Sequence, residues 1–421
     1  MPLLPPDLLG PLLQRPVAVF GAGVSGQGVA TLLAALGGQG VIYDEKAAAA
    51  RATFTRRQAA RHGLVVFSPG FVPGHRWLAT ARAAGCLCLG ELDFASLFGP
   101  RELLAVTGTN GKTTLTEFLA HALNSAGRPA QVTGNIGHPL SRFVVEQAER
   151  ACVAVCEVSS FQAETLQHLR PTATLWTNFA EDHLERHAGL EAYFAAKWRL
   201  VERTAGALFV GSSVQRFAEQ FGRTLPAGAS LATAGQPADP QLAGTAFAAY
   251  PQRENFILAA AWWRHAGLPA AALYAAARSF RLGQHRLARV GERRSITFWN
   301  DSKATNFHAV EAALGTFDRP VWWIGGGRPK GGDLDGFVDR IAPRVRHAIL
   351  IGETQAGLDT RFRLHHVPTT PCATLEAAVR AAFAAAGPGD HVLLSPGFAS
   401  FDMFRNYQDR GLQFEKIVDN L

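Results

Sequence analysis

The sequence predicts an α/β protein of three domains, each built on a largely parallel sheet. The apolar runs at residues 15–20 and 103–106 are each followed by a glycine-containing turn and then by helical apolar spacing, the strand–turn–helix order of such sheets. In the last third, residues 321–324, 347–351 and 391–394 form largely continuous apolar runs. Runs of this kind indicate parallel strands covered on both faces.

Length and composition set further bounds. At 421 residues the chain exceeds one typical core, and 48% hydrophobic and 18% charged residues fit a globular protein. The 41 lysines and arginines against 34 aspartates and glutamates give a formal net charge of +7, without a long basic run. We therefore do not expect nucleic-acid binding, and a polyanionic small-molecule substrate would suit this charge equally well. No apolar run reaches membrane-spanning length.

The cysteines and the first residues bear on the cellular compartment. The five cysteines are odd in number and lack the paired Cys-x-x-Cys pattern of a zinc site. Their apolar surroundings favour buried, reduced thiols and a reducing compartment. Residues 1–14 are apolar but contain Asp7 and several prolines and lack a basic start, so they make a poor signal peptide. We expect a cytoplasmic monomer.

The first domain, expected over residues 1–98, carries a dinucleotide-type fingerprint. Its first strand leads into Gly-Ala-Gly-Val-Ser-Gly at residues 21–26, and the next strand ends in Asp44. This pattern predicts a nucleotide at a helix N-terminus more firmly than it predicts NAD. A later strand is followed by Ser68-Pro69-Gly70, at the edge where ligands bind in such sheets. Residues 98–101 are expected to form the linker to the next domain.

A phosphate-binding loop opens the central domain. The turn after the second apolar run is Thr107-Gly108-Thr109-Asn110-Gly111-Lys112-Thr113-Thr114. Backbone N–H groups of such a loop converge on a phosphate at the positive end of the following helix. We expect Lys112 to reach the terminal phosphates and Thr113 to bind magnesium. The generic loop has glycine where Val106 stands. An ordinary turn is the alternative, but a lysine at this end of a helix dipole costs free energy unless an anion binds.

Two polar side chains follow later strands of the same domain. Glu157 ends one apolar run and His183 follows another. Strand ends converge on the nucleotide in an open α/β sheet, so together with Lys112 and Thr113 these residues favour a magnesium site. Singly, each would be interpreted as a satisfied polar residue. For Lys197, which lies in a helical stretch with apolar neighbours, the sequence alone favours a solvated helix lysine.

The rest of the chain divides into two domains. The central domain, a P-loop mononucleotide-binding parallel sheet, is expected over residues 99–282, and the C-terminal domain over residues 283–421. In the latter, a strand beginning at Ile296 ends in the charged turn Asn300-Asp301-Ser302-Lys303-Ala304-Thr305-Asn306. Alternating strands and helices predict Rossmann-like folds for the N-terminal and C-terminal domains.

Several long runs resemble the Mur ligases, which add amino acids to UDP-N-acetylmuramic acid in peptidoglycan synthesis. These runs are residues 107–114, 157–162, 178–183 and 300–306. The last of them, together with Ser68-Pro69-Gly70 and residues 394–402, is most similar to the branch that adds D-glutamate to UDP-N-acetylmuramoyl-L-alanine. The match runs nearly from end to end, so the resemblance implies an ATP-dependent, amide-forming ligase.

The resemblance also implies a mechanism. ATP phosphorylates the substrate's terminal carboxylate to an acyl phosphate, the glutamate amine attacks, and phosphate leaves from a tetrahedral intermediate. Lys112, magnesium and helix dipoles would offset charge on the transferred phosphoryl group. Thr113 and Glu157 would hold one magnesium ion, and His183 and Lys197 would help with a second. Lys197 matches the family lysine that carries CO₂ as a carbamate, which turns a cation into an anionic oxygen ligand.

The same resemblance implies the ligand-binding residues. Those for ATP are Gly108, Thr109, Asn110, Gly111, Lys112, Thr113, Thr114, Asn255, Arg286 and Asp301. Those around the uridine diphosphate are Val24, Ser25, Asp44, Glu45, Ser68, Pro69 and Gly70, and those near the muramoyl part are Asn135, Ser159 and Gln162. Those for the incoming glutamate are Lys303, Thr305, Lys330, Ser400 and Tyr407. The first domain would therefore hold UDP rather than NAD, and two lysines suit a dicarboxylate.

Some positions depart from the family's pattern. Pro251-Gln252 replaces a usual His-Asn before Asn255, Pro329 stands where an acid is common, and Tyr407 replaces a usual phenylalanine. Because several changes fall around the amino-acid pocket, D-glutamate, L-glutamate and another amino acid all stay open. Outside the family, the first fingerprint would suit a nicotinamide-dependent oxidoreductase or a redox sensor, but such proteins need no triphosphate loop.

Overall fold

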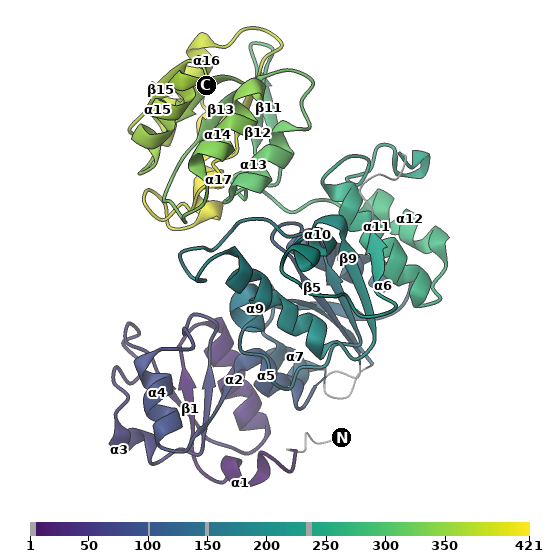
Figure 1. Cartoon of the computed structure of the whole chain (residues 1–421), viewed down its shortest axis with the longest axis vertical. Coiled ribbons are helices and arrows are strands. Elements are labelled where there is room, and N and C mark those ends of the chain that lie inside the picture. Colours follow the sequence, from purple (N-terminus) through teal and green to yellow (C-terminus); the bar gives the residue numbers. More distant parts are fainter. Residues whose placement is uncertain (1–5, 100–101, 148–150, 233–237) are drawn as a thin grey trace. The chain divides into compact units, whose positions relative to one another are not determined.

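The computed structural model describes residues 6–99, 102–147, 151–232 and 238–421 (Figure 1). These residues form three sheets, which confirms the predicted α/β class with parallel sheets. The chain divides into two compact units. The first contains Met1–Phe179, Phe194–Ala248 and Gln252–Phe280, and the second contains Ala180–Tyr193, Ala249–Pro251 and Arg281–Leu421. Of the expected linker, residues 100 and 101 lie outside the described residues.

The N-terminal sheet is parallel throughout, in the order β2–β1–β3–β4. Its strands are β1 (Val17–Phe20), β2 (Gly40–Tyr43), β3 (Leu64–Phe67) and β4 (Leu87–Gly90), and its helices are α1 (Gly10–Leu13), α2 (Val24–Ala35), α3 (Arg56–Ala59), α4 (Arg76–Ala83) and α5 (Glu91–Ser96). Val19 packs in one core cluster and Phe20 in another, because successive strand residues point to opposite faces. The continuous apolar run of β1 is thereby explained.

The central sheet is also parallel, in the order β10–β9–β8–β5–β7–β6. Its strands are β5 (Leu103–Thr107), β6 (Ala130–Gly134), β7 (Val153–Glu157), β8 (Ala173–Trp176), β9 (Ala207–Gly211) and β10 (Ser230–Ala232). The helices are α6 (Lys112–Ser125), α7 (Leu140–Glu146), α8 (Ser160–Ala163), α9 (Leu190–Arg203), α10 (Ser212–Gln220), η1 (Pro240–Leu242), α11 (Gln252–His265) and α12 (Ala270–Ser279). Helices α6, α11 and α12 contact one another (Figure 1). Strand β5 lies between β7 and β8, so the three strand ends expected to carry polar residues are neighbours.

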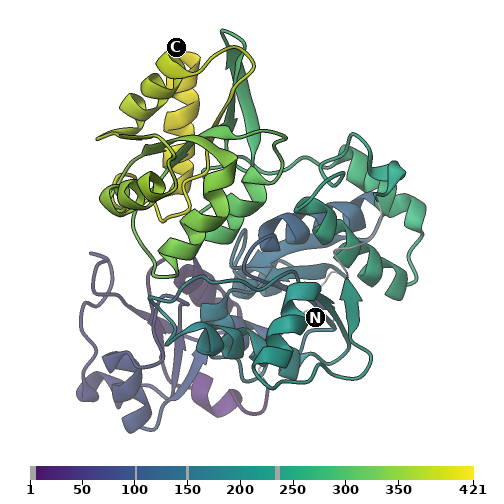
Figure 2. The same cartoon turned by 45° about the horizontal axis from the view of Figure 1, so that its top comes forward.

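The C-terminal sheet has the order β11–β12–β16–β13–β14–β15, and only the pairing of β11 with β12 is antiparallel. Its strands are β11 (Ala288–Arg293), β12 (Ile296–Asn300), β13 (Val321–Gly325), β14 (Val345–Leu350), β15 (Thr369–Pro371) and β16 (His391–Leu394). Its helices are α13 (Phe307–Leu314), α14 (Leu334–Ile341), η2 (Ala342–Arg344), α15 (Gln355–Leu364), α16 (Leu375–Ala385) and α17 (Tyr407–Asp419). Helices α13, α14 and α15 share a core cluster with Trp323, and α16 and α17 share another with Ile324. Figure 2 shows this last third of the chain, in green and yellow, from a second side.

The N-terminal and central sheets share one hydrophobic core. Val19 and Leu33 belong to the same buried cluster as Ala105, Leu140 and Ala154. Helix α7 contacts both α2 and α5. In this packing, the carboxylate of Glu91 accepts hydrogen bonds from Ser141 N (2.8 Å) and Oγ (2.7 Å). The first unit is therefore joined by apolar packing as well as by buried polar contacts.

The composition predicts reduced, buried cysteines and no membrane-spanning segment. All five cysteines are free thiols, and only Cys152 is not buried. Burial raises the pKa of Cys88 to about 11, so this thiol is protonated at neutral pH. Within the described ranges, no helix combines the length and apolar character needed to cross a bilayer.

Candidate active site

The loop between β5 and α6 has the backbone shape of a phosphate cradle. Gly108 has φ +147° and Gly111 has φ +80°, values that L side chains rarely adopt. A Cβ at Gly108 would lie 1.9 Å from Thr177 Oγ1, and one at Gly111 would lie 2.6 Å from Asn255 Oδ1. Both glycines are thus required by space as well as by conformation, and the side chain of Asn255 lies beside the loop.

The end of β8 anchors this loop. Thr109 N donates to Asn178 O (3.0 Å), and Asn110 N donates to Asn178 Oδ1 (2.9 Å). In return, Thr177 Oγ1 donates to the carbonyl oxygen of Asn110 (2.6 Å). The loop is therefore held in place before any ligand binds, which lowers the entropic cost of binding a phosphate.

Two lysines meet at this loop. Lys112 Nζ donates to the carbonyl oxygens of Gly108 (2.9 Å) and Thr109 (2.8 Å). Lys197, on α9 and only 1% exposed, donates from Nζ to the same Gly108 oxygen (2.9 Å) and to Thr107 Oγ1 (3.3 Å). The solvated-helix interpretation of Lys197 is therefore wrong. The chain buries this side chain against the phosphate loop, because its helix packs on the central sheet.

Glu157 has the features of a metal ligand. It is buried at the end of β7, and its Oε1 accepts a hydrogen bond from Asn135 Nδ2 (2.8 Å). Its Oε2 and the Oγ1 of Thr114 are buried without a hydrogen-bond partner in the described part of the chain. A buried, unpaired carboxylate oxygen is costly unless a cation binds it. With Thr113 in the first turn of α6, this donor set fits a magnesium ion.

The other two residues expected near the muramoyl group make a local structural contact. Ser159 and Gln162 form a capping box at the start of α8, in which Ser159 N donates to Gln162 Oε1 (3.0 Å). Gln162 also lines a cavity of ≈ 10 Å³ together with Pro69 from the N-terminal sheet. The structure thus brings Gln162 and Pro69, two predicted residues of the UDP-linked substrate site, to one cavity within the first unit.

The N-terminal site is organised by Asp44. Its carboxylate accepts from the backbone N–H groups of Ala22 (2.8 Å) and Lys46 (2.8 Å), and these bonds lower its pKa. It therefore ties the first glycine turn to the end of β2. Glu45 pairs with Arg76.

The remaining predicted UDP residues lie on neighbouring loops. Val24 is 68% exposed at the first turn of α2, where Ser25 follows it. Ser68 Oγ is buried without a hydrogen-bond partner among the described residues. It lies beside the left-handed Gly21, where a Cβ would come within 2.6 Å of it. Pro69 and Gly70 follow Ser68 in the turn after β3.

His183 belongs to the second unit, whereas Thr113, Glu157 and Lys197 belong to the first. It has φ +55°, and its Nδ1 lies 3.4 Å from Glu185 Oε1. Burial lowers its pKa, which favours the neutral imidazole that binds metals. The four-residue metal set stays a prediction.

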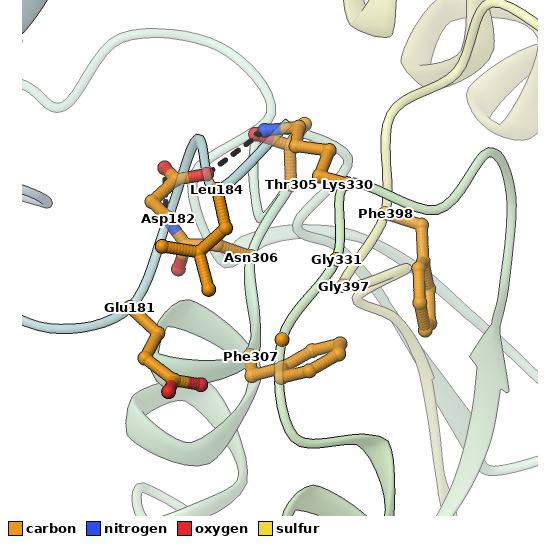
Figure 3. A pocket seen from close by; sticks show the side chains of 11 residues that line it. Glu181, Asp182, Leu184, Thr305, Asn306, Phe307, Lys330, Gly331, Gly397 and Phe398 are labelled. Carbon is orange, nitrogen blue, oxygen red and sulfur yellow. Dashed lines mark hydrogen bonds and ion pairs between the residues drawn. The ribbon is translucent and has the colours of Figure 1, made fainter. Parts of the chain in front are cut away.

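A small polar pocket in the second unit holds two of the predicted amino-acid residues (Figure 3). Lys330 Nζ lies 3.3 Å from Asp182 Oδ1 and 3.4 Å from Thr305 Oγ1. Asn306 Nδ2 donates to Asp182 Oδ2 (2.9 Å). The pocket encloses only ≈ 20 Å³, room for about one water molecule. The carboxylate of Asp182 therefore occupies the place beside Lys330 that suits an anionic ligand.

The other predicted amino-acid residues lie on nearby turns of the same unit. Lys303 Nζ lies 4.0 Å from the ring centroid of Tyr407, a cation–π contact. Ser400 is buried after β16. Sequence reasoning did not select Asp182 or Asn306 as site residues. The signal was present, since both lie inside runs that carry the family resemblance.

Asp301 is a buried carboxyl group at the end of β12. Oδ2 accepts from Ser395 Oγ (2.8 Å), and Oδ1 accepts from Leu287 N (3.1 Å). Burial raises its pKa to about 7, against the opposing effects of these two hydrogen bonds and, after them, of the charge of Arg286. Arg286 follows His285 in the segment that leads into β11, so these two predicted ATP residues act on each other.

The sheet topology and the two candidate sites can now be compared with those of known protein families. Residues 106–242 match the Mur ligase middle domain, and residues 285–398 match the Mur ligase glutamate ligase domain. The chain belongs to the Mur ligase family.

Among its relatives, the UDP-N-acetylmuramoylalanine–D-glutamate ligase of Gloeobacter violaceus is 36% identical, over 96% of this chain and 98% of the relative. The protein of the same name from Mycobacterium tuberculosis is also 36% identical, over 99% and 98%.

Solved structures show the same fold at low identity. The UDP-N-acetylmuramate–alanine ligase MurC of Thermotoga maritima has a TM-score of 0.61 at 14% identity, covering 96% of this chain and 99% of that one. A pseudomurein peptide ligase type C from Methanothermus fervidus has a TM-score of 0.60, also at 14% identity, with the same coverage.

Proposed function

We propose that this chain is an ATP-dependent ligase that joins D-glutamate to UDP-N-acetylmuramoyl-L-alanine in peptidoglycan synthesis. The observation that carries the proposal is the 36% identity to two ligases of that name over nearly the whole chain. The phosphate loop with its two glycines and Lys112, and Lys197 of α9 packed against it, support ATP as the energy source. We propose three domains with boundaries after residues 98 and 282, and a cytoplasmic monomer without nucleic-acid or membrane partners.

The proposed chemistry has two steps. A carboxylate is a poor electrophile, so the terminal phosphoryl group of ATP is first transferred to a carboxylate oxygen of the substrate, releasing ADP. The amine of glutamate then attacks the acyl carbon, the C–O bond to phosphate breaks, and inorganic phosphate leaves as the amide forms. Lys112 and the N-terminus of α6 stabilise negative charge on the transferred group. Asn255 and the loop from Gly108 to Thr114 hold the nucleotide, and Arg286 and Asp301 are the further residues proposed to bind ATP.

Magnesium is the proposed metal. Thr113 and Glu157 would hold one ion, and His183 and a carbamylated Lys197 would help to hold a second. The unpaired Oε2 of Glu157 supports this assignment. Bound magnesium would neutralise phosphate charge.

Two further groups of residues receive the substrates. The N-terminal residues around Asp44 and Ser68, with Asn135, Ser159 and Gln162, receive the UDP-linked substrate. Lys303, Thr305, Lys330, Ser400 and Tyr407 receive the amino acid. Tyr407 is itself a departure from the family's pattern and Pro329 directly precedes Lys330, so L-glutamate and other amino acids are tested beside D-glutamate.

One assay tests the proposal. Purified full-length protein receives ATP, magnesium and UDP-N-acetylmuramoyl-L-alanine, with D-glutamate, L-glutamate or no amino acid in separate tubes. We expect phosphate release and a product of the mass of the amide with D-glutamate only. Product with L-glutamate alone would redirect the proposal to the other stereoisomer, and absence of phosphate release in every tube would refute it.

A further inference from the structure

Arg410 is the buried charge that the proposed chemistry leaves unexplained. It lies in the first turn of α17 and is 1% exposed. Its Nε donates to Ser302 Oγ (3.0 Å) and its Nη2 to Ser302 O (2.9 Å). Nη1 and Nη2 also lie 3.3 and 3.4 Å from the carbonyl oxygen of Phe398. The guanidinium is thus surrounded by acceptors from two other segments.

This arrangement is costly if its only purpose is packing. Arg410 makes no direct ion pair with any described residue, and burial lowers its pKa to about 10 although the more distant carboxylates of Asp402 and Asp301 act in the opposite direction. Burying a charge without a directly paired ion is unfavourable, and an apolar side chain of similar volume often stabilises such a site better. The side chain must therefore do something that an apolar residue cannot do, which is to fix the positions of several polar acceptors at once.

The segments that Arg410 joins all carry predicted amino-acid residues. Ser302 immediately precedes Lys303, and Phe398 lies two residues before Ser400. Tyr407 lies one helical turn before Arg410 on α17. Its carbonyl oxygen accepts a hydrogen bond from Ser302 Oγ (2.9 Å). One side chain thus connects the turn after β12, the loop after β16 and the start of α17.

We propose that Arg410 is a positioning residue that sets the geometry of the amino-acid pocket and thereby its preference for the chain length of glutamate. By holding Ser302 and Phe398, it fixes Lys303 relative to Ser400 and Tyr407. The two carboxylates of a dicarboxylic amino acid reach these groups only if their separation matches the spacing of the turns. A shift of the turns therefore affects glutamate and the shorter aspartate differently. The inference rests on the proposed function and names a specificity determinant of the same site.

The test separates the amino-acid pocket from the first chemical step. Arg410→Lys keeps a charge but loses the planar fork of donors, and Arg410→Met keeps volume but loses every donor. Arg363→Met is the control, because Arg363 is an exposed arginine on α15 whose side chain pairs with Asp359. Hydroxylamine replaces the amino acid in a parallel assay. This small nucleophile captures an acyl phosphate as a hydroxamate without using the amino-acid pocket.

We expect Arg410→Lys to raise the KM for glutamate by on the order of ten- to a hundredfold. In the same variant, the preference for glutamate over aspartate, measured as a ratio of kcat/KM values, should fall. The rate of hydroxamate formation and the KM for ATP stay within about twofold of wild type. Arg363→Met changes none of these quantities.

Ser302→Ala provides a second route if Arg410→Met does not fold, as judged by its thermal unfolding. It removes one acceptor of the same network and should raise the KM for glutamate less than Arg410→Lys does. A variant that combines Arg410→Lys with Ser302→Ala should raise the KM for glutamate by less than the product of the two single increases, because both changes break the same contact.

Two results would overturn the inference alone. One is an unchanged KM for glutamate in Arg410→Lys, and the other is an equal loss of hydroxamate formation and ligation. A wild-type protein that forms neither hydroxamate nor amide would overturn the proposed function and this inference with it, and that result is visible before any variant is made.

Discussion

Lys112 and Lys197 donate to the same carbonyl oxygen of Gly108, so two side-chain amines lie together in a mostly buried place. Two ammonium groups that share one acceptor oxygen repel each other, and burial makes both positive charges still less favourable. Conversion of Lys197 to a carbamate would replace one positive charge with a negative one. The contact therefore gives a physical reason, independent of family resemblance, for the proposed modification.

We predict that Lys197→Ala lowers the ligation rate by about a hundredfold or more, because an oxygen ligand of the metal is lost. Added formate or acetate should restore part of the rate, since a free carboxylate can take the place of the carbamate. Arg199→Ala, an exposed change on the same helix, should leave the rate unchanged. Full activity of Lys197→Ala without added acid would contradict the carbamate.

A second residue-level prediction concerns Asp301. Its pKa is raised from 3.8 to about 7 by burial, so the folded chain keeps a proton between those values that the unfolded chain releases. The free energy of unfolding therefore falls as the pH rises from about 4 to about 7, by on the order of 4 kcal/mol at most.

Thermal unfolding of the full chain at pH 5 and pH 8, without nucleotide, checks this. Relative to wild type, Asp301→Asn should gain stability at pH 8 compared with pH 5, because asparagine has no proton to lose. Parallel shifts of the two proteins between these pH values would show that Asp301 does not titrate in this range.

At the scale of elements, helix α6 has a left-handed glycine at each end. Gly111 (φ +80°) precedes it and Gly127 (φ +75°) follows it. A Cβ at Gly111 would meet Asn255, whereas one at Gly127 would meet nothing within 4 Å. The two positions share the conformational strain of a substitution and differ in what surrounds them.

We therefore predict that Gly127→Ala lowers the free energy of unfolding by about 1 kcal/mol, and that Gly111→Ala lowers it by at least as much because Asn255 must also move. Only Gly111→Ala should also weaken ATP binding, by about tenfold or more, because the loop and Asn255 must move apart. Titration calorimetry with ATP and chemical unfolding measure the two effects separately. Equal ATP affinity in both variants would mean that the loop does not bind the nucleotide.

The elements themselves could be predicted because their signals are local. The apolar run and glycine turn around Gly108 lie within about a dozen residues, and so does the break between α11 and α12. Contacts that complete the pocket are not local. Asn306 bonds Asp182 across 124 positions, and Arg410 bonds Ser302 across 108. No spacing rule links such residues, so only the folded chain reveals that they meet. Lys197 shows the same limit, since its helix has an exposed face and an apolar face and the sequence did not place the lysine on the buried one.

For the whole molecule, the three sheets do not correspond to three separate cores. One buried cluster contains residues of the N-terminal sheet, of the central sheet and of α7, including Leu140. The C-terminal sheet has its own clusters, one of which contains Leu358 of α15. We infer that the proposed boundary after residue 98 separates two ligand sites but not two independently stable parts, because removing either side would expose this shared core.

Leu140 and Leu358 are both fully buried leucines on helices, so they form a matched pair of probes. Each change to alanine should cost about 2–5 kcal/mol. We predict that Leu140→Ala speeds hydrogen exchange in β1 and in β5, because both strands rest on the cluster that loses volume, and leaves β13 unchanged. Leu358→Ala should do the reverse, speeding exchange in β13 alone. If Leu140→Ala affected β5 but left β1 as protected as in wild type, the N-terminal sheet would be stable by itself and the shared core would not hold the two sheets together.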